Sequence, residues 1–421
     1  MNSTAFHNAD ILLPKDTDMH KWSVIACDQY TSEPEYWQEV LSIVGDSPST
    51  LSLILPELYL EQDGVEQRIG AIHSSMEKYL TDGIFTEHKD AMIYVERTQS
   101  NGILRQGIVG AIDLEKYDFS KGSTSEVRAT EATVIERIPP RIKVRQGAPL
   151  ELPHIMILID DPDKTVIEPI AGEISDADKL YDFDLMQNGG SIKGYLLGSK
   201  VQESIDKALC ALAAPEAFRE KYGLEDTPVL LYAMGDGNHS LATAKEFYEQ
   251  LKKANPDKDL SNHPARYALA EIVNLHSPAL QFEAIHRIVT DVNVTELLTD
   301  LSEKLALSSE SGVQKITIVE NGIHRDTYIN KPLSKLAVGS LQSALDEILS
   351  DIGGRIDYIH GTEVVDALSK KENSIGFILP DMAKSELFPT VIADGALPRK
   401  TFSMGHAEDK RFYIEARRIT E

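Results

Sequence analysis

The chain has 421 residues, of which 42% are hydrophobic and 26% charged, so we expect a globular protein of two or three domains, or of one large domain with insertions. Its 42 Lys and Arg stand against 67 Asp and Glu, and the formal charge of −25 makes nucleic acid and membrane surfaces poor partners. With two cysteines, no secretory leader and no long apolar run, the sequence predicts a cytoplasmic protein without a disulfide framework.

Helix and strand patterns alternate along the first half of the chain. Apolar residues at helical spacing predict helices over residues 28–44, 65–83 and 199–223. Apolar runs between turn residues predict strands over 91–98, 105–114 and 153–162.

Two prolines interrupt residues 133–147. Pro139 and Pro140 are incompatible with a regular helix interior, so we expect an extended or turn-like segment. On a strand, Arg141, Lys143 and Arg145 would share one face. A solvated face explains that pattern, and anion binding is the alternative.

The second half of the chain continues the alternation. It predicts helices over 239–254 and 340–352, a hairpin at Asn321-Gly322, and strands over 228–237, 373–380 and 412–419. The best candidate linkers are 254–264 and 290–293. We therefore expect a mixed α/β (α+β) fold, with mixed sheets and helices packed around them. Its expected domains are 1–290, N-terminal and central, and 291–421, C-terminal.

The stretch "MGDGNHS" at 234–240 joins a predicted strand to a predicted helix. Gly235 and Gly237 permit a tight turn and a close approach of a ligand to the backbone. The first amide groups of a helix lack internal partners and carry the positive end of its dipole, so the turn suits a phosphate or carboxylate. The spacing matches neither a Walker A loop nor a dinucleotide fingerprint.

The polar residues of this turn are the first site candidates. His239 and Ser240 lie in the first helical turn, beside Asn238, and Lys245 follows one to two turns later. Asp236 is our first choice for a Mg²⁺ ligand or a catalytic base. The structural alternative is that Asp236 or Asn238 only caps the helix and that His239 only satisfies a carbonyl group. The scattered histidines predict no structural zinc.

The segment "PVLLYAMGDGNHSLATAKEF" resembles the signature of the bacterial and archaeal family called domain of unknown function 1015. In that family a strand leads through Asp-Gly-His-His-Arg into a helix. Further stretches resemble family segments along nearly the whole chain: "WSVIACDQYTSEPEYW", "IHRIV" and "GFILPDMAKSELFP". The motif is also remotely similar to the Gly-x-His-Arg element of the ParB/sulfiredoxin group. That group includes kinases acting on free serine, and there the element cradles nucleotide phosphates.

The chain departs from the family pattern at two positions. Asn238 stands where the first histidine is usual, and Ser240 stands where the arginine is usual. The missing arginine removes a bidentate phosphate ligand, so another cation has to serve in its place. The candidates are Lys245, Arg287 and Lys384.

Two further polar pairs follow predicted strands or lie at their ends. The resemblance and the charge make His286 and Arg287 a candidate phosphate-binding pair or general base, and a strand end is the alternative. Lys384 and Ser385 come after the strand ending at Pro380, where ligands bind in α/β folds. Helix caps are the alternative for that pair.

The C-terminal loop and the N-terminal segment contain the remaining candidates. Arg399, Lys400, His406 and Lys410 make the loop basic, as expected of a lid over an anionic substrate or of a solvated turn. In "ACDQY", Asp28 is a base, a metal ligand or a cap, and Cys27 is expected to be a small buried hydrophobe rather than a nucleophile.

Three functions fit these observations. The first is a small-molecule kinase that binds ATP or ADP with Mg²⁺ and uses Asp236, His239 and Lys384 in catalysis. The second is a hydrolase of a phosphorylated or carboxylated metabolite. The third is a non-catalytic sensor of an anionic metabolite or nucleotide. A homodimer stays open in all three.

Overall fold

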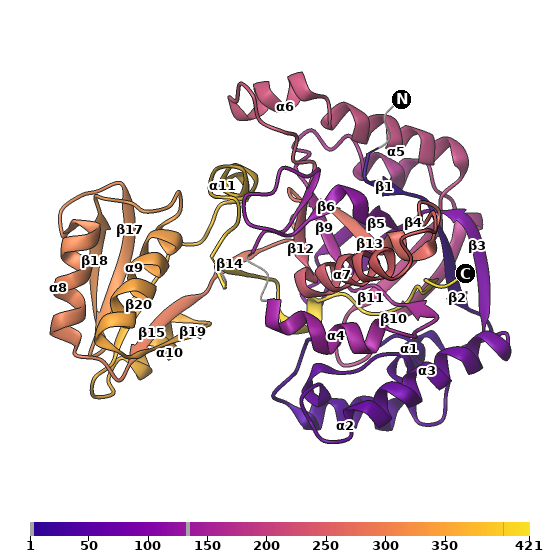
Figure 1. Ribbon diagram of the computed structural model, residues 1–421, viewed down its shortest axis with the longest axis horizontal. Helices are drawn as coiled ribbons and strands as arrows, with labels where there is room; N and C mark the ends of the chain where they lie inside the picture. Colours follow the sequence, from indigo (N-terminus) through magenta and orange to yellow (C-terminus); the bar gives the residue numbers. More distant parts are fainter. Residues whose placement is uncertain (1–3, 132–134, 399) are drawn as a thin grey trace. The chain divides into compact units, whose positions relative to one another are not determined.

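The computed structural model describes residues 4–131, 135–398 and 400–421 (Figure 1). The chain forms two compact units. Unit 1 consists of Met1–Ala129, Thr133–Leu280 and Gly405–Glu421, and unit 2 consists of Thr130–Ala132 and Gln281–Met404. These units differ in their bounds from the expected domains 1–290 and 291–421, and that expected division stays a prediction.

A mixed ten-stranded sheet forms the centre of unit 1. The path across the sheet is β10 (Lys179–Asp184), β11 (Ser191–Leu196), β4 (Ile93–Thr98), β5 (Leu104–Asp113), β13 (Tyr267–Asn274), β9 (Met156–Ile159), β12 (Tyr232–Asp236), β7 (Val127–Arg128) and β6 (Tyr117–Asp118), with β1 (Phe6–His7) on β5. The pairs β13–β9 and β12–β7 are parallel, whereas β12–β9 and β4–β5 are antiparallel.

Both faces of this sheet are covered by apolar clusters. Successive side chains of a strand point to opposite faces, so neighbouring residues of one strand enter different clusters. In β5, Ile108 belongs to one apolar cluster and Val109 to the other. Helices and two small sheets cover these faces: α1 (Met19–Trp22), α2 (Pro34–Val44), α3 (Val65–Thr81), α4 (Ile138–Arg145), α5 (Ser199–Leu212), α6 (Pro215–Tyr222), α7 (Asn238–Ala254), β2 (Ala9–Pro14) with β3 (Phe85–Ala91), and β8 (Leu150–Glu151) with β22 (Arg417–Arg418).

Unit 2 has an antiparallel six-stranded sheet. Its hairpin turns at Asn321 and Gly322, as predicted, and both residues have positive φ, which that turn requires. The elements are β16 (Leu307–Ser308), β18 (Ile323–Ile329), β17 (Gln314–Glu320), β20 (Ile375–Ile378), β15 (His286–Thr290) and β19 (Arg355–Ile359), the helices α8 (Val294–Leu305), α9 (Ala337–Ile352), α10 (Thr362–Leu368) and α11 (Leu387–Asp394), and the separate pair β14 (Phe282–Ala284) with β21 (Phe402–Met404).

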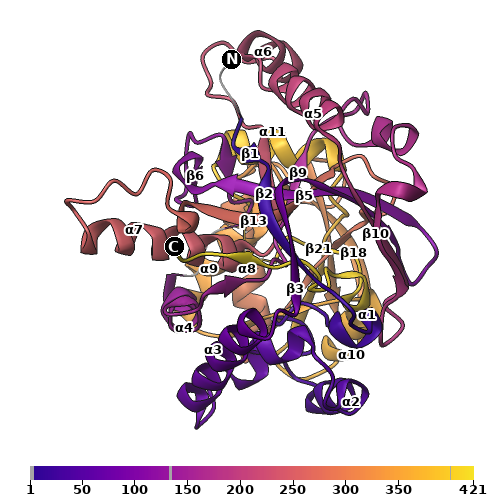
Figure 2. The same ribbon diagram turned by 90° about the vertical axis from the view of Figure 1, so that its right-hand side faces the viewer.

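The expected extended segment at 133–147 is wrong for its described part. Ile138–Arg145 forms helix α4, and Pro139 and Pro140 lie in its first turn, where a proline costs no hydrogen bond. Consequently the three basic residues 141, 143 and 145 lie on a helix rather than on one face of a strand. Helix α4 packs against α7 (Figures 1 and 2).

Two other expectations change in detail. The helix expected over 199–223 ends at Leu212 and restarts at Pro215, because proline lacks the amide that a continuous helix needs. Only Arg417–Arg418 of the expected strand 412–419 pairs as a regular strand, β22 with β8. Isolated bridges join Phe412 to Ile25 and Ala416 to Leu12, so this segment still runs through unit 1.

Candidate functional site

The predicted strand–turn–helix at the motif is confirmed. Strand β12 ends at Asp236, and α7 starts after Gly237, whose φ of 77° is left-handed. A Cβ at Gly237 would lie 3.1 Å from the Cα of Ile155, so a side chain here would strain the backbone and press on Ile155. Helix α7 therefore begins without a capping side chain from its N-cap residue.

A lysine from the C-terminal segment reaches this helix start. Lys410 Nζ lies 3.2 Å from Asp236 Oδ2, and both side chains are less than one-fifth exposed. The other oxygen of Asp236 accepts the Gly237 amide at 2.9 Å. The motif thus presents a positive helix end, a carboxylate and an ammonium in one place.

A second carboxylate lies within the field of the same lysine. Burial disfavours the charged form of Asp28, but His154, Gln29 and Lys410 outweigh it and hold the pKa of Asp28 below its ordinary value. Asp28 Oδ2 also lies 4.0 Å from His154 Nε2. Asp28 is therefore ionised at neutral pH, and its side chain is only partly exposed.

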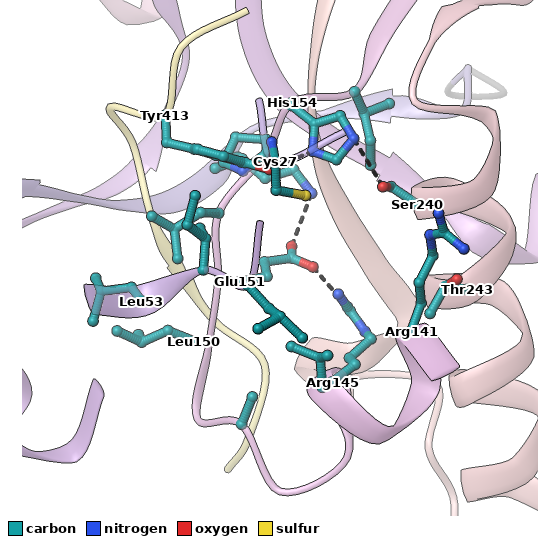
Figure 3. A pocket seen from close by; sticks show the side chains of 18 of the residues that line it. Cys27, Leu53, Arg141, Arg145, Leu150, Glu151, His154, Ser240, Thr243 and Tyr413 are labelled. Atoms are coloured by element: carbon teal, nitrogen blue, oxygen red, sulfur yellow. Dashed lines mark hydrogen bonds and ion pairs between the residues drawn. The ribbon is translucent and has the colours of Figure 1, made fainter. Parts of the chain in front are cut away.

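His154 connects the motif to the C-terminal segment (Figure 3). Its Nε2 shares a hydrogen bond of 2.9 Å with Ser240 Oγ, and its Nδ1 shares one of 2.7 Å with the Tyr413 hydroxyl. The Cys27 amide donates to that hydroxyl at 3.1 Å. Burial raises the pKa values of both Tyr413 and the Cys27 thiol, so each stays protonated at neutral pH.

The structure therefore adds His154 and Tyr413 to the candidate site, which sequence reasoning missed. His154 is the polar residue just before the apolar strand β9, and the antiparallel pairing of β9 with β12 brings it to the motif. A lone histidine beside a strand is not by itself a signal for a site. Asp28 and Lys410 were candidates, but nothing in the sequence joins them to residues 234–240.

The remaining motif residues differ in their surroundings. Lys245 Nζ binds the Leu114 carbonyl at 2.9 Å and Glu249 at 2.9 Å, so its charge is already engaged along α7. Asn238 Oδ1 is buried and accepts no hydrogen bond from the described residues. The His239 carbonyl accepts the Thr243 hydroxyl at 2.7 Å.

The other predicted phosphate ligands of the C-terminal half divide between the units. His406 is exposed in unit 1, and Arg399 lies outside the described residues. In unit 2, His286 Nδ1 accepts the Leu379 amide at 3.2 Å, and burial lowers the pKa of His286. This histidine is therefore neutral at pH 7 and supports the end of β20.

Arg287 is completely buried in unit 2. Its guanidinium donates to Gln342 at 2.8 Å and to the Ile285 carbonyl at 2.6 Å, and it stacks on the Tyr358 ring. This arrangement is typical of a structural arginine. Lys384 and Ser385 begin a short 3-10 turn in which the Ala383 amide donates to Glu386 at 2.8 Å. Burial lowers the pKa of Lys384. The phosphate-binding roles of these unit 2 residues stay predictions.

A cavity of about 150 Å³ lies next to His154 and Ser240 in unit 1 (Figure 3). Helix α4 lines it with Arg141 and Arg145, whose spacing of four residues puts both on one helix face. Lys143 is exposed and pairs with Glu66 at 3.6 Å. On the expected strand all three cations would share one face. On the helix, only Arg141 and Arg145 face the cavity, and Lys143 lies at the surface.

Within residues 4–131, 135–398 and 400–421, no three His, Cys, Asp or Glu side chains are grouped so as to hold a metal ion. In the same ranges, no helix has the length and apolar content needed to cross a membrane. The Mg²⁺ predicted at Asp236 stays a prediction, and that carboxylate already binds Lys410.

The fold and the site define a mixed α/β protein with a polar site at a helix N-terminus. The chain belongs to the family described as "Protein of unknown function (DUF1015)", whose model matches residues 10–394. No curated protein matches it.

Several solved structures are similar to the chain. A free serine kinase in complex with AMP is 11% identical, with a TM-score of 0.37, over 73% of this chain and 90% of that one. C-terminally truncated SbnI from Staphylococcus aureus is 10% identical, with a TM-score of 0.36, over 70% and 82%. A conserved hypothetical protein from Pyrococcus furiosus is 12% identical, with a TM-score of 0.34, over 72% and 97%. Similarities of this size do not define an activity.

Proposed function

We propose that the chain is a small-molecule phosphotransferase. A nucleotide phosphate binds the amide groups at the start of α7, and its terminal phosphoryl group passes to a hydroxyl of a small metabolite such as an amino acid. The observation that supports this most is the position of Lys410 Nζ, 3.2 Å from Asp236 at a helix start that no N-cap side chain covers. An ammonium has three N–H donors, so it can bind a phosphate while the ion pair persists.

The reaction needs a base for the acceptor hydroxyl, and Asp28 suits that role. It is ionised at neutral pH because His154 and Lys410 lower its pKa. The acceptor oxygen forms a bond to the terminal phosphorus, the bond from that phosphorus to the bridging oxygen breaks, and the hydroxyl proton passes to Asp28. Lys410 and the dipole of α7 stabilise the negative charge on the transferred group.

The Ser240–His154 hydrogen bond favours one second candidate, a hydrolase. A histidine within hydrogen-bond distance of a serine hydroxyl is the arrangement that activates a serine nucleophile. Ser240 Oγ and His154 Nε2 lie 2.9 Å apart, within the range needed for proton transfer between them. A hydrolase would transfer the substrate group to water instead of to an acceptor metabolite.

The test is phosphorus NMR of the full chain with ATP or ADP, Mg²⁺ and a panel of hydroxyl-bearing amino acids. We expect a new phosphate ester, and in Lys410→Met we expect its rate to fall by about 10²- to 10³-fold, the usual loss for a removed charge-stabilising donor. The matched control is Lys252→Met, a lysine at the far end of α7 that pairs with Glu115 and Glu249. Its rate should stay within about two-fold of the parent because surface ion pairs contribute little.

Two results would contradict the phosphotransferase. Hydrolysis of phosphate or carboxylate esters without nucleotide binding would favour the hydrolase. Nucleotide binding without turnover of any acceptor would favour the sensor.

A further inference from the structure

The cavity beside His154 and Ser240 has an apolar wall (Figure 3). In that view Leu53 and Leu150 line it from one side and Ser240 and Thr243 from the other. Further apolar side chains complete the wall: Leu55, Leu60, Met76 and Val144. Its volume is about 150 Å³. An apolar cavity of roughly 150 Å³ accommodates a group the size of benzene.

The charged residues of the cavity are paired with one another. Two guanidinium nitrogens of Arg141 donate hydrogen bonds to Glu57 Oε1. Arg145 Nη2 lies 2.6 Å from Glu151 Oε2. Each arginine therefore has its counter-charge within the wall itself. A second anionic group of a ligand would have to displace these carboxylates from the two arginines. The wall therefore favours an uncharged group.

One end of the cavity is polar. His154 and Ser240 line it and share a hydrogen bond of 2.9 Å, and Ser240 lies in the first turn of α7. An apolar group in the cavity thus places its attached polar group beside the helix start. The cavity therefore joins an apolar compartment, whose charges are paired, to a polar end.

We infer that this cavity binds the uncharged apolar part of a small amphiphilic ligand, a phenyl or branched aliphatic group, whose single anionic or hydroxyl group lies at His154, Ser240 and the start of α7. This deepens the proposed function, on which the position of the polar end rests, by defining the substrate class. A small metabolite with an apolar side chain fits the cavity better than a fully polar one.

The experiment is calorimetric titration of the full chain with phenyl phosphate, inorganic phosphate and toluene. We expect phenyl phosphate to bind about 10- to 100-fold more tightly than inorganic phosphate, because burying an apolar group of this size contributes that factor. Saturating toluene should weaken the binding of phenyl phosphate and leave that of inorganic phosphate unchanged. Equal affinities of the two phosphates, or no competition by toluene, would overturn the inference.

A pair of variants at Val144 tests the position of the apolar group. Val144→Phe fills the cavity and should reduce the affinity for phenyl phosphate to that for inorganic phosphate, whereas Val144→Ala should retain the preference. An unchanged preference in a folded Val144→Phe would also overturn the inference. If toluene binds but neither phosphate does, the apolar compartment is supported and the proposed anion site at α7 fails.

Discussion

Glu271 lies at the centre of a buried ionic network in unit 1. Its carboxylate accepts Arg411 Nε at 2.8 Å and lies 3.5 Å from Arg105, and Arg411 also binds Glu415 at 2.8 Å. The Glu271 and Arg411 side chains are at most 5% exposed. Burial opposes the charge on Glu271, but Arg105 and Arg411 lower its pKa below the ordinary value. The network ties the C-terminal segment to strand β13.

Replacing this carboxylate should be strongly destabilising. Glu271→Gln leaves the buried charge of Arg411 only partly compensated, and we expect the free energy of unfolding to fall by about 3–5 kcal/mol. Urea unfolding followed by circular dichroism measures it. Glu77→Gln, on the exposed face of α3, is the control and should change stability by no more than about 0.5 kcal/mol. A loss in Glu271→Gln no larger than the control's limit of about 0.5 kcal/mol would contradict a stabilising network.

The same residue predicts the pH dependence of stability. Since its folded pKa is lowered, the stabilisation is complete above the unfolded value of about 4.5 and is lost as pH falls through the folded pKa. Glu151, which Arg417 and Arg145 stabilise in the same way, acts in the same direction. We expect the urea midpoint to fall steeply below about pH 4.5, with a shallower fall in Glu271→Gln.

At the scale of elements, the site depends on how α7 begins. Gly237 adopts a left-handed conformation and packs against Ile155, so an N-cap side chain would strain the backbone and displace Ile155 slightly from the helix. Because Ile155 follows His154, such a displacement would also disturb the hydrogen bond to Ser240. The glycine thus joins backbone conformation to the geometry of the site.

Gly237→Ala should therefore lose stability and ligand binding together. The left-handed conformation alone costs about 1–2 kcal/mol for a residue with a Cβ. Gly198 is a matched control, because it is the N-cap residue of α5, has an extended backbone, and has open space around a Cβ. Gly198→Ala should leave the melting temperature and phosphate affinity nearly unchanged. Thermal unfolding and calorimetry measure both, and equal behaviour of the two variants would contradict the role of Gly237.

At the scale of the whole molecule, unit 1 is built from segments that are far apart in the sequence. Gly405–Glu421 belongs to it, although the intervening 281–404 belongs to unit 2. Backbone hydrogen bonds join Tyr413 to Val24 and Ala416 to Leu12, and Arg411 donates to the Pro153 carbonyl. Phe412, Ile414 and Ile419 are buried. The chain end therefore completes a core that the N-terminal residues begin.

A chain that ends at Met404 should fail to fold unit 1. It lacks the buried side chains of the C-terminal segment and leaves Arg97 and Arg105 without their carbonyl acceptors at Glu408 and Asp409. We expect aggregation or loss of cooperative unfolding. A chain that ends at Ile419 is the control, because Thr420 and Glu421 are exposed, and it should unfold like the full chain. Gel filtration and circular dichroism distinguish these outcomes.

The sequence by itself determined the family, the mixed α/β class and the turn between β12 and α7. These features depend on residues close together along the chain: alternating apolar residues, helical spacing and glycines at a turn. It did not reveal α4, since prolines forbid a helix interior but not a helix start.

Only the tertiary structure brought Asp28, His154 and Lys410 to residues 236–240. Two long-range events place them there: the antiparallel pairing of β9 with β12, and the return of the C-terminal segment along the N-terminal residues. Such contacts depend on burial and hydrogen bonding summed over the whole core. No pattern of neighbouring residues in the sequence therefore predicts them.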